Sequence, residues 1–210
     1  GQYTETWTGK TIRINDYNKD LGAVKDTVNG FDRFGVYNYS ASVTTKIYGI
    51  VNFKPKNKVQ SIRHTISPSI SYSNSPSFEK YYDTYIIDAN GNTAEYTRFQ
   101  GGLYNAPGRD YSSSIGLTIK NVIEAKVKPR DSAETELRKI DIFKNLNIAT
   151  SYNVAAEEFN LAPIRVTGSV DLAKGFTVNT GATFDAYALD ENNKRINVFN
   201  SKNGGGLLRL

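Results

Sequence analysis

The stretch Ser-Ile-Arg-His-Thr-Ile-Ser-Pro-Ser-Ile-Ser-Tyr, at residues 61–72, alternates between two kinds of side chain. All of its odd-numbered positions are polar, whereas its even-numbered positions are apolar apart from His64. Successive side chains of a β-strand point to opposite faces of the sheet. The alternation therefore predicts a strand with one apolar and one hydrophilic face.

The same alternation recurs over longer stretches of the chain. Between residues 111 and 127 the odd positions carry mostly apolar side chains and the even positions mostly polar ones. Long strands with one face for lipid and one for water form the wall of a transmembrane β-barrel. The pattern predicts an all-β fold, an antiparallel transmembrane β-barrel of which this chain supplies a part.

Composition agrees with this fold class and excludes several others. An apolar fraction of 39% is enough, because a barrel strand needs apolar side chains on only half of its positions. No run of about 18 apolar residues is present, which excludes a membrane-spanning helix. The net charge of +5 is spread along the chain, unlike the single basic surface of a nucleic-acid-binding protein. Without cysteine, the chain forms no disulfide and no cysteine metal site.

Both ends of the sequence predict that it is a piece of a longer protein. The chain begins at Gly1 and has no methionine, and the final residues 206–210 resemble the start of another strand. We therefore expect residues 1–210 to form part of one barrel domain. Any N-terminal periplasmic domain and the remaining strands would lie outside this segment.

Alternation and turn residues together predict about seven wall strands and the beginning of an eighth. The hydrophilic residues 16–32 and 74–110 are expected to be long loops, and the second loop contains a small hairpin turning at Asn90-Gly91. Shorter connections are expected at 54–58, 129–138, 155–162 and 174–175. The predicted wall strands are residues 3–15, 35–53, 60–73, 111–128, 139–154, 163–173 and 176–187.

Four residues interrupt the alternation inside these strands. Lys144 falls on the apolar face of its strand and Phe143 on the polar face, which a β-bulge would explain for both residues. A lysine that extends to the membrane interface would explain Lys144 alone. Pro68 and Pro163 each lack a backbone donor, so each predicts a strand end, a bulge or a weak point in the ladder.

Loop lengths predict the orientation of the strands. Outer-membrane barrels have short periplasmic turns and longer extracellular loops. If residues 74–110 are one extracellular excursion, the connections at 54–58, 129–138 and 174–175 are periplasmic. Aromatic side chains then gather at both rims, with Tyr37, Tyr39 and Tyr72 at the extracellular ends and Phe53 and Phe176 at the periplasmic ends.

The sequence predicts no catalytic residue, no metal-ligand set and no cofactor. His64 is the only histidine, and we interpret it as an interfacial side chain. Acidic residues are scattered through the loops without EF-hand spacing, so solvated loop charge is a better interpretation than calcium binding. The glycine run at 203–206 lacks the lysine of a phosphate-binding loop.

Five basic side chains fall on the predicted polar faces and would face the barrel lumen. There they are candidates for contact with an anionic solute or with the phosphates of a lipid headgroup. An alternative has equal weight, namely that Glu124, Asp171 and Asp185 pair with them across strands. The five candidates are Lys46, Arg63, Lys120, Lys126 and Arg165.

Several segments, in the same order along nearly the whole chain, resemble LptD, the outer-membrane lipopolysaccharide-assembly protein, in its Bacteroidota form. They include the Thr-Glu-Thr-Trp at residues 4–7 and residues 44–53, 62–72, 99–104 and 187–197. The resemblance implies a barrel in the cell outer membrane that inserts lipopolysaccharide into the outer leaflet. It also implies as partners a plug lipoprotein of the LptE type, a periplasmic lipopolysaccharide-bridge protein and outer-membrane lipids.

Two alternative functions stay open from the sequence. One is another outer-membrane barrel, such as a porin or the barrel of a nutrient receptor, and a plug domain upstream would favour it. The other is a soluble secreted β-sandwich that serves as an adhesin or carbohydrate-binding module. Solubility without detergent would distinguish that second alternative.

Overall fold

The computed structural model describes residues 1–129, 136–173 and 176–210, and in this part of the chain the fold is all-β. It contains antiparallel strands and two short 3₁₀ helices, and no α-helix. The chain divides into two compact units, residues 1–40 with 73–113 and residues 41–72 with 114–210. The predicted all-β, antiparallel fold class is confirmed.

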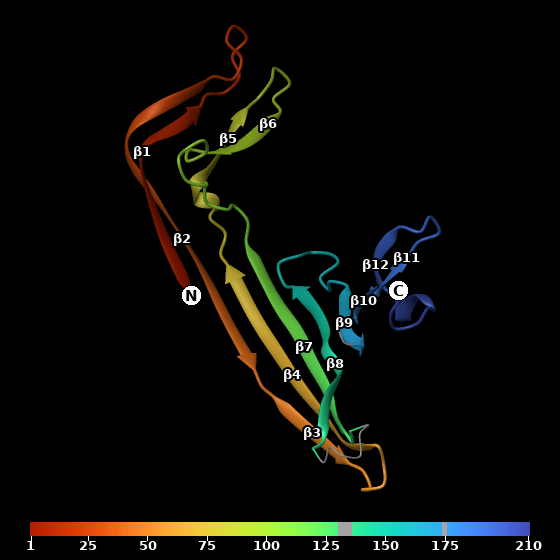
Figure 1. The fold of residues 1–210 in the computed structure, drawn as a ribbon. Coiled ribbons are helices and arrows are strands. Elements are labelled where there is room, and N and C mark those ends of the chain that lie inside the picture. Colours follow the sequence, from red (N-terminus) through yellow and green to blue (C-terminus); the bar gives the residue numbers. More distant parts are fainter. Residues whose placement is uncertain (130–135, 174–175) are drawn as a thin grey trace. The chain divides into compact units, whose positions relative to one another are not determined.

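The strands have the following bounds (Figure 1). They are β1 (Gln2–Ile14), β2 (Lys25–Thr44), β3 (Ile47–Asn52), β4 (Val59–Ser75), β5 (Tyr82–Ile86), β6 (Thr93–Thr97), β7 (Ser112–Val127), β8 (Arg138–Asn153), β9 (Ile164–Ala173), β10 (Phe176–Phe184), β11 (Tyr187–Leu189) and β12 (Arg195–Phe199). The 3₁₀ helices are η1 (Glu79–Tyr81) and η2 (Asn200–Asn203).

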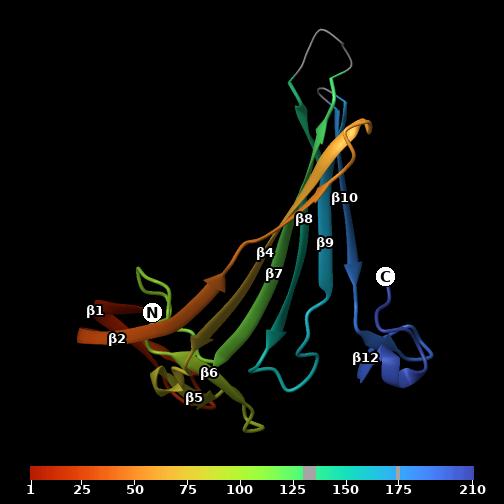
Figure 2. The ribbon, with the colours of Figure 1, turned by 90° about the horizontal axis from the view of Figure 1, so that it is seen from below.

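One sheet contains every predicted wall strand, in the order β1-β2-β4-β7-β8-β9-β10, with β3 paired to β4 as well. Within the second unit, β4, β7, β8, β9 and β10 run side by side as a continuous wall (Figure 2). Residues 206–210 do not form the expected eighth strand, and only Arg209 makes an isolated bridge, to Asp185. The predicted turn at 174–175 and most of the one at 129–138 lie outside the described residues.

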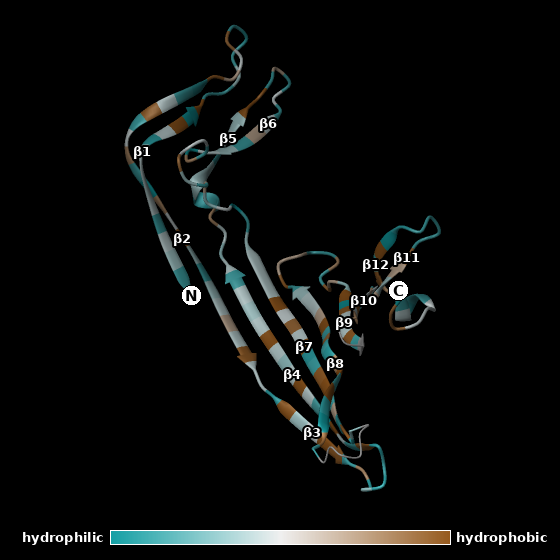
Figure 3. Ribbon diagram, in the orientation of Figure 1, coloured by the Kyte–Doolittle hydropathy of each residue, from teal (hydrophilic) through white to brown (hydrophobic). Residues whose placement is uncertain are grey.

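The large apolar side chains on β4 and β7 are exposed or half-buried, and none of them is buried in a core. Ile115 is 42% exposed and Leu117 37%, and hydropathy alternates in bands along β4 and β7 (Figure 3). Partners directly opposite in the ladder share a face, and Ile115, opposite Tyr152, is one such apolar pair. An exposed apolar face on long strands is the surface that a barrel turns toward lipid.

The predicted strand at 35–53 is interrupted, and the interruption lies beside Pro68. β2 ends at Thr44 and β3 begins at Ile47. At this point the Thr45 backbone nitrogen donates to the Pro68 carbonyl over 3.1 Å, but Pro68 has no N–H to return a bond. The ladder therefore breaks opposite the proline, as predicted for a proline within a strand. Lys46 lies in this break, which corrects its expected place on a strand face.

The prediction of a loop over residues 16–32 is wrong for its second half. β2 begins at Lys25, and its first residues pair with the end of β1, with Lys25 opposite Ile14. Residues 25–32 are rich in Asp, Asn and Gly, which are poor strand formers. Pairing with the neighbouring strand overrides this local preference.

The irregularity predicted from Phe143 and Lys144 is a bulge in β8. The register against β7 shifts between Asn121 and Glu124, so that Phe143 lies opposite Ile123. Lys144 forms an ion pair with Asp171 on β9. The bulge thus restores Phe143 to the apolar side and directs Lys144 to a carboxylate, as the first of the two interpretations requires.

In the first unit, residues 74–110 form an excursion with its own small sheet, as predicted. β5 and β6 form a two-stranded sheet of their own, and they turn through Gly91 at φ +80°. Beside this hairpin, an aromatic core buries Phe34, Phe78 and Phe99, and the rings of Phe34 and Phe99 lie 4.7 Å apart. The core fixes the excursion onto β2.

The C-terminal segment of the second unit is held by a carboxylate between two arginines. Asp185 Oδ2 lies 2.8 Å from Arg195 Nε and 3.1 Å from Arg209 Nη2. The Arg195 guanidinium also lies 4.8 Å from the Phe159 ring and 4.6 Å from the Tyr187 ring. These contacts fasten the β11–β12 hairpin to the loop that follows β8.

Candidate functional site

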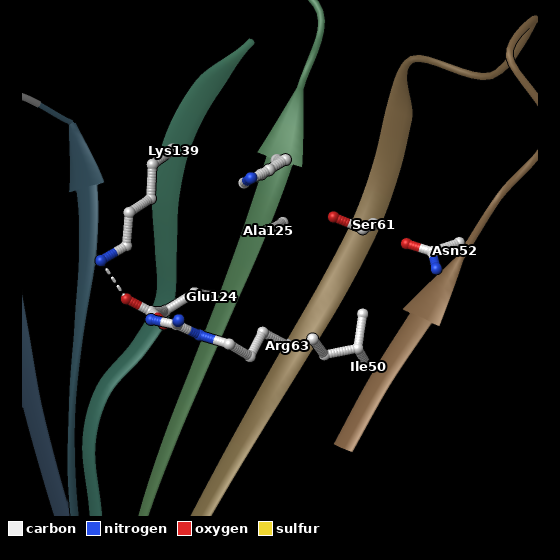
Figure 4. A pocket seen from close by; sticks show the side chains of 8 residues that line it. Ile50, Asn52, Ser61, Arg63, Glu124, Ala125 and Lys139 are labelled. Carbon is white, nitrogen blue, oxygen red and sulfur yellow. Dashed lines mark hydrogen bonds and ion pairs between the residues drawn. The ribbon is translucent and has the colours of Figure 1, made fainter. Parts of the chain in front are cut away.

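A cavity of about 320 Å³ lies on the charged face of the second unit, over β3, β4, β7 and β8 (Figure 4). It is close to the turn at 54–58, because the strands that line it end there. The Lys128 backbone nitrogen donates to the Lys58 carbonyl over 2.9 Å and holds these strand ends together. The lining residues are Ile50, Asn52, Ser61, Arg63, Glu124, Ala125, Lys126 and Lys139.

Glu124 is the centre of the charges in this cavity. Arg63 Nε donates to Glu124 Oε2 over 2.7 Å, and Lys139 forms an ion pair with Glu124 Oε1. The Glu124 side chain is only 9% exposed, whereas the side chains of Arg63 and Lys139 are 49% and 58% exposed. The carboxylate is therefore covered by two cations that stay accessible from the cavity.

Sheet register explains how the cluster forms. Glu124 is on β7, which lies between β4, the strand of Arg63, and β8, the strand of Lys139. Lys126 and Lys139 are directly opposite each other in the β7–β8 ladder, so their side chains share a face. Two like charges in this arrangement repel each other, and the pairing of Lys139 with Glu124 compensates for part of that repulsion.

The cavity carries an excess of positive charge. Three cations and one carboxylate line it, which gives a net charge of +2. Lys126 is exposed and has no ion-pair partner among the residues that the structure describes. Guanidinium and ammonium donors beside the Ser61 hydroxyl and the Asn52 amide form a set suited to an anion such as a phosphate.

The structure brings together two of the five predicted lumen-facing residues. Arg63 and Lys126 line the cavity. Lys120 lies further along β7, opposite Asn147, and Arg165 lies on β9, opposite Ala149. Both are exposed and outside the cavity.

Sequence reasoning missed Lys139. Its odd number places it on the polar face of the predicted strand 139–154, and that signal alone would have added it to the candidates. The alternative of cross-strand pairing is seen for Glu124, which binds Arg63. Asp171 and Asp185 instead pair with Lys144 and with two arginines outside the predicted set.

Two kinds of feature are absent from residues 1–129, 136–173 and 176–210. No group of three or more histidine, cysteine, aspartate or glutamate side chains is placed to hold a metal ion there. Over the same ranges no helix has both the length and the apolar character needed to cross a membrane.

Long antiparallel strands with an exposed apolar face and a charged opposite face are consistent with part of a membrane β-barrel wall. The model of one protein family, described as LptD protein, matches residues 1–187. The chain therefore belongs to the LptD family, whose members are outer-membrane lipopolysaccharide-transport proteins and not enzymes. Comparisons with curated proteins and with solved structures gave no significant match.

Proposed function

We propose that this chain is a section of the wall of an outer-membrane translocon that inserts lipopolysaccharide into the outer leaflet. The observation that carries the proposal is the amphipathic wall of the second unit in a chain of the LptD family. Lipopolysaccharide has phosphorylated sugars and several acyl chains, so its passage needs a polar route beside an apolar exit. A wall with one charged and one apolar face supplies a surface for each part of the lipid.

The polar face would contact the sugar and phosphate part of the lipid. Arg63, Lys126 and Lys139 gather at one end of the wall, and Lys120 lies on the same strand as Lys126. Arg165 on β9 and Lys46 in the break before β3 extend the candidate set. These exposed cations offer donors for phosphate along the wall.

We also propose where this wall lies in the full-length protein and which partners act with it. Residues 1–210 would form part of a single barrel domain in the cell outer membrane, completed by strands beyond this segment. A plug lipoprotein of the LptE type would occupy the barrel, and a periplasmic bridge protein would deliver lipopolysaccharide to it. Family membership supports these partners.

Depletion of the full-length protein tests the proposal. Lipopolysaccharide should accumulate inside the envelope and disappear from the cell surface, while uptake of small solutes changes only as a later effect. Surface labelling of lipopolysaccharide and uptake of a radiolabelled solute measure the two processes. Normal surface lipopolysaccharide with a specific uptake defect would instead identify a porin or receptor barrel.

Photocrosslinking tests the route along the charged face. A crosslinker at Arg63 or Lys120 should capture lipopolysaccharide during transport in living cells. Val51 is the control, because it is exposed on the apolar face beside the predicted periplasmic turn at 54–58 and away from the outer leaflet. Equal capture at all three positions would contradict a route that follows the charged face.

A further inference from the structure

The positively charged cavity has a carboxylate, Glu124, at its centre. Both carboxylate oxygens are engaged, Oε2 by Arg63 and Oε1 by Lys139. In Figure 4 the Arg63 and Lys139 side chains converge on Glu124 from the strands on its two sides. An incoming phosphate needs these same donors, so it would compete with the carboxylate for them.

Burial and exposure show how that competition would work. Glu124 is nine-tenths buried, so it stays in place, whereas about half of the Arg63 and Lys139 side chains is exposed. Both cations are long and flexible, and each can turn part of its donor set toward the cavity. Lys126 is already exposed there without a partner among the described residues.

We propose that this cavity is a transient binding station for a phosphorylated headgroup, and that Glu124 is a built-in competitor that keeps the binding weak enough for release. A conducting site must bind its cargo well enough to admit it and weakly enough to let it leave. Without Glu124, three uncompensated cations would bind a phosphate more tightly and release it more slowly. One fixed carboxylate lowers the net charge from +3 to +2 and takes up part of the donor set. The inference rests on the proposed function, since it specifies how the cargo meets this wall.

The test measures binding to the purified full-length protein in detergent. The probes are phosphorylated lipopolysaccharide, the same lipid after enzymatic removal of its phosphates, and an anionic glycerophospholipid. Glu124→Gln removes the charge and keeps the shape of the side chain, and should tighten binding of the phosphorylated lipid about tenfold, because one opposing charge is lost. Binding of the dephosphorylated lipid should not change.

Further variants distinguish two roles of Glu124, namely competition with the phosphate for Arg63 and Lys139 and simple anchoring of these two cations. Glu124→Gln combined with Lys126→Gln restores the net charge of +2 and should return the affinity to that of the unmodified protein. Lys126→Glu lowers the net charge of the cavity by two units, from +2 to 0, and should weaken binding of the phosphorylated lipid by more than about tenfold. This variant tests the cavity itself if Glu124→Gln fails to assemble, because unchanged binding would overturn its assignment as the binding station. Glu157→Gln, in the loop after β8, removes a carboxylate elsewhere and should have no effect.

Unchanged or weaker binding in Glu124→Gln, with normal assembly, would show that Glu124 only anchors the two cations, and would overturn the inference. If Glu124→Gln tightened binding of the glycerophospholipid by the same factor, the cavity would bind lipid phosphates in general. Selectivity for the phosphates of lipopolysaccharide would then be excluded. Failure of the proposed function is a separate outcome. It would appear as normal surface lipopolysaccharide after depletion, whereas the binding results describe the cavity whatever the cargo is.

Discussion

His64 Nε2 lies 3.0 Å from Asn121 Oδ1, so the single histidine of the chain joins β4 to β7. The Asn121 amide nitrogen in turn donates to the backbone carbonyl of Leu146 on β8 over 3.3 Å. Asn121 is 8% exposed and stands where the β7–β8 register shifts. A side chain in the middle of the sheet thus supplies hydrogen bonds where the bulge interrupts the ladder.

Asn121→Ala should destabilise the wall by about 1–3 kcal/mol, because it leaves buried polar groups of the bulge without a partner. Such groups are costly where no water is available to replace the bond. The temperature at which the purified protein unfolds on a denaturing gel measures the loss. Asn145→Ala is the control, since Asn145 is exposed on the neighbouring strand. Equal effects of the two changes would contradict a special role for Asn121.

Leu117→Arg should impair assembly of the barrel far more than Thr118→Arg. Leu117 is 37% exposed on the apolar face, where an arginine at mid-membrane costs about 2–4 kcal/mol. Thr118 is the next residue on β7 and points to the opposite, charged face. The amount of folded protein in outer-membrane fractions measures both. Similar yields for the two variants would mean that the faces are assigned incorrectly.

An epitope inserted at Asn90-Gly91 should bind antibody on intact cells, and one at Lys56-Asn57 should bind only after the outer membrane is opened. The first site is the tip of the β5–β6 hairpin in the long excursion, and the second is in the short turn between β3 and β4. Outer-membrane barrels place long loops outside and short turns in the periplasm. The opposite pattern of labelling would reverse the topology.

The β5–β6 turn should lose stability in acid through Asp88. The side-chain hydrogen bond from Asn92, and then the backbone N–H groups of Asn90, Gly91 and Asn92, lower the pKa of Asp88 below its ordinary value. A lowered pKa means that the charged form stabilises the fold. This stabilisation is complete above the ordinary pKa of about 3.9 and is lost as pH falls through the lowered value.

Chemical-shift titration of the Asp88 carboxyl and of the Gly91 amide measures this transition. Both signals should change together at a pH below about 3.9. Asp88→Asn keeps the turn residues and removes the titrating group, so the Gly91 signal should then stay constant over the same range. A Gly91 shift that persists in this variant would assign the transition to another group.

The alternation of polar and apolar residues along the sequence was enough to predict most strands of the wall. Alternation at residues 61–72 and 111–127 predicted β4 and β7 because the two faces of a strand meet different surroundings. The bulge in β8 was also visible locally, since an extra residue on each side of Phe143 reverses the order of polar and apolar positions there and then restores it. The Asn90-Gly91 turn identified the excursion, because glycine adopts positive φ without strain.

Contacts between strands decided where β2 begins, where β3 begins and which side chains meet in the cavity. The start of β2 at Lys25 depends on pairing with β1, and the gap before β3 depends on Pro68 in a different strand. The cavity also depends on the pairing of strands that are distant in the sequence. Arg63 and Glu124 are 61 positions apart, and only the β4–β7 register places the guanidinium against the carboxylate. A sequence records which face a side chain occupies, but the neighbour across the ladder is set by how the strands pair, and that pairing is a property of the folded sheet.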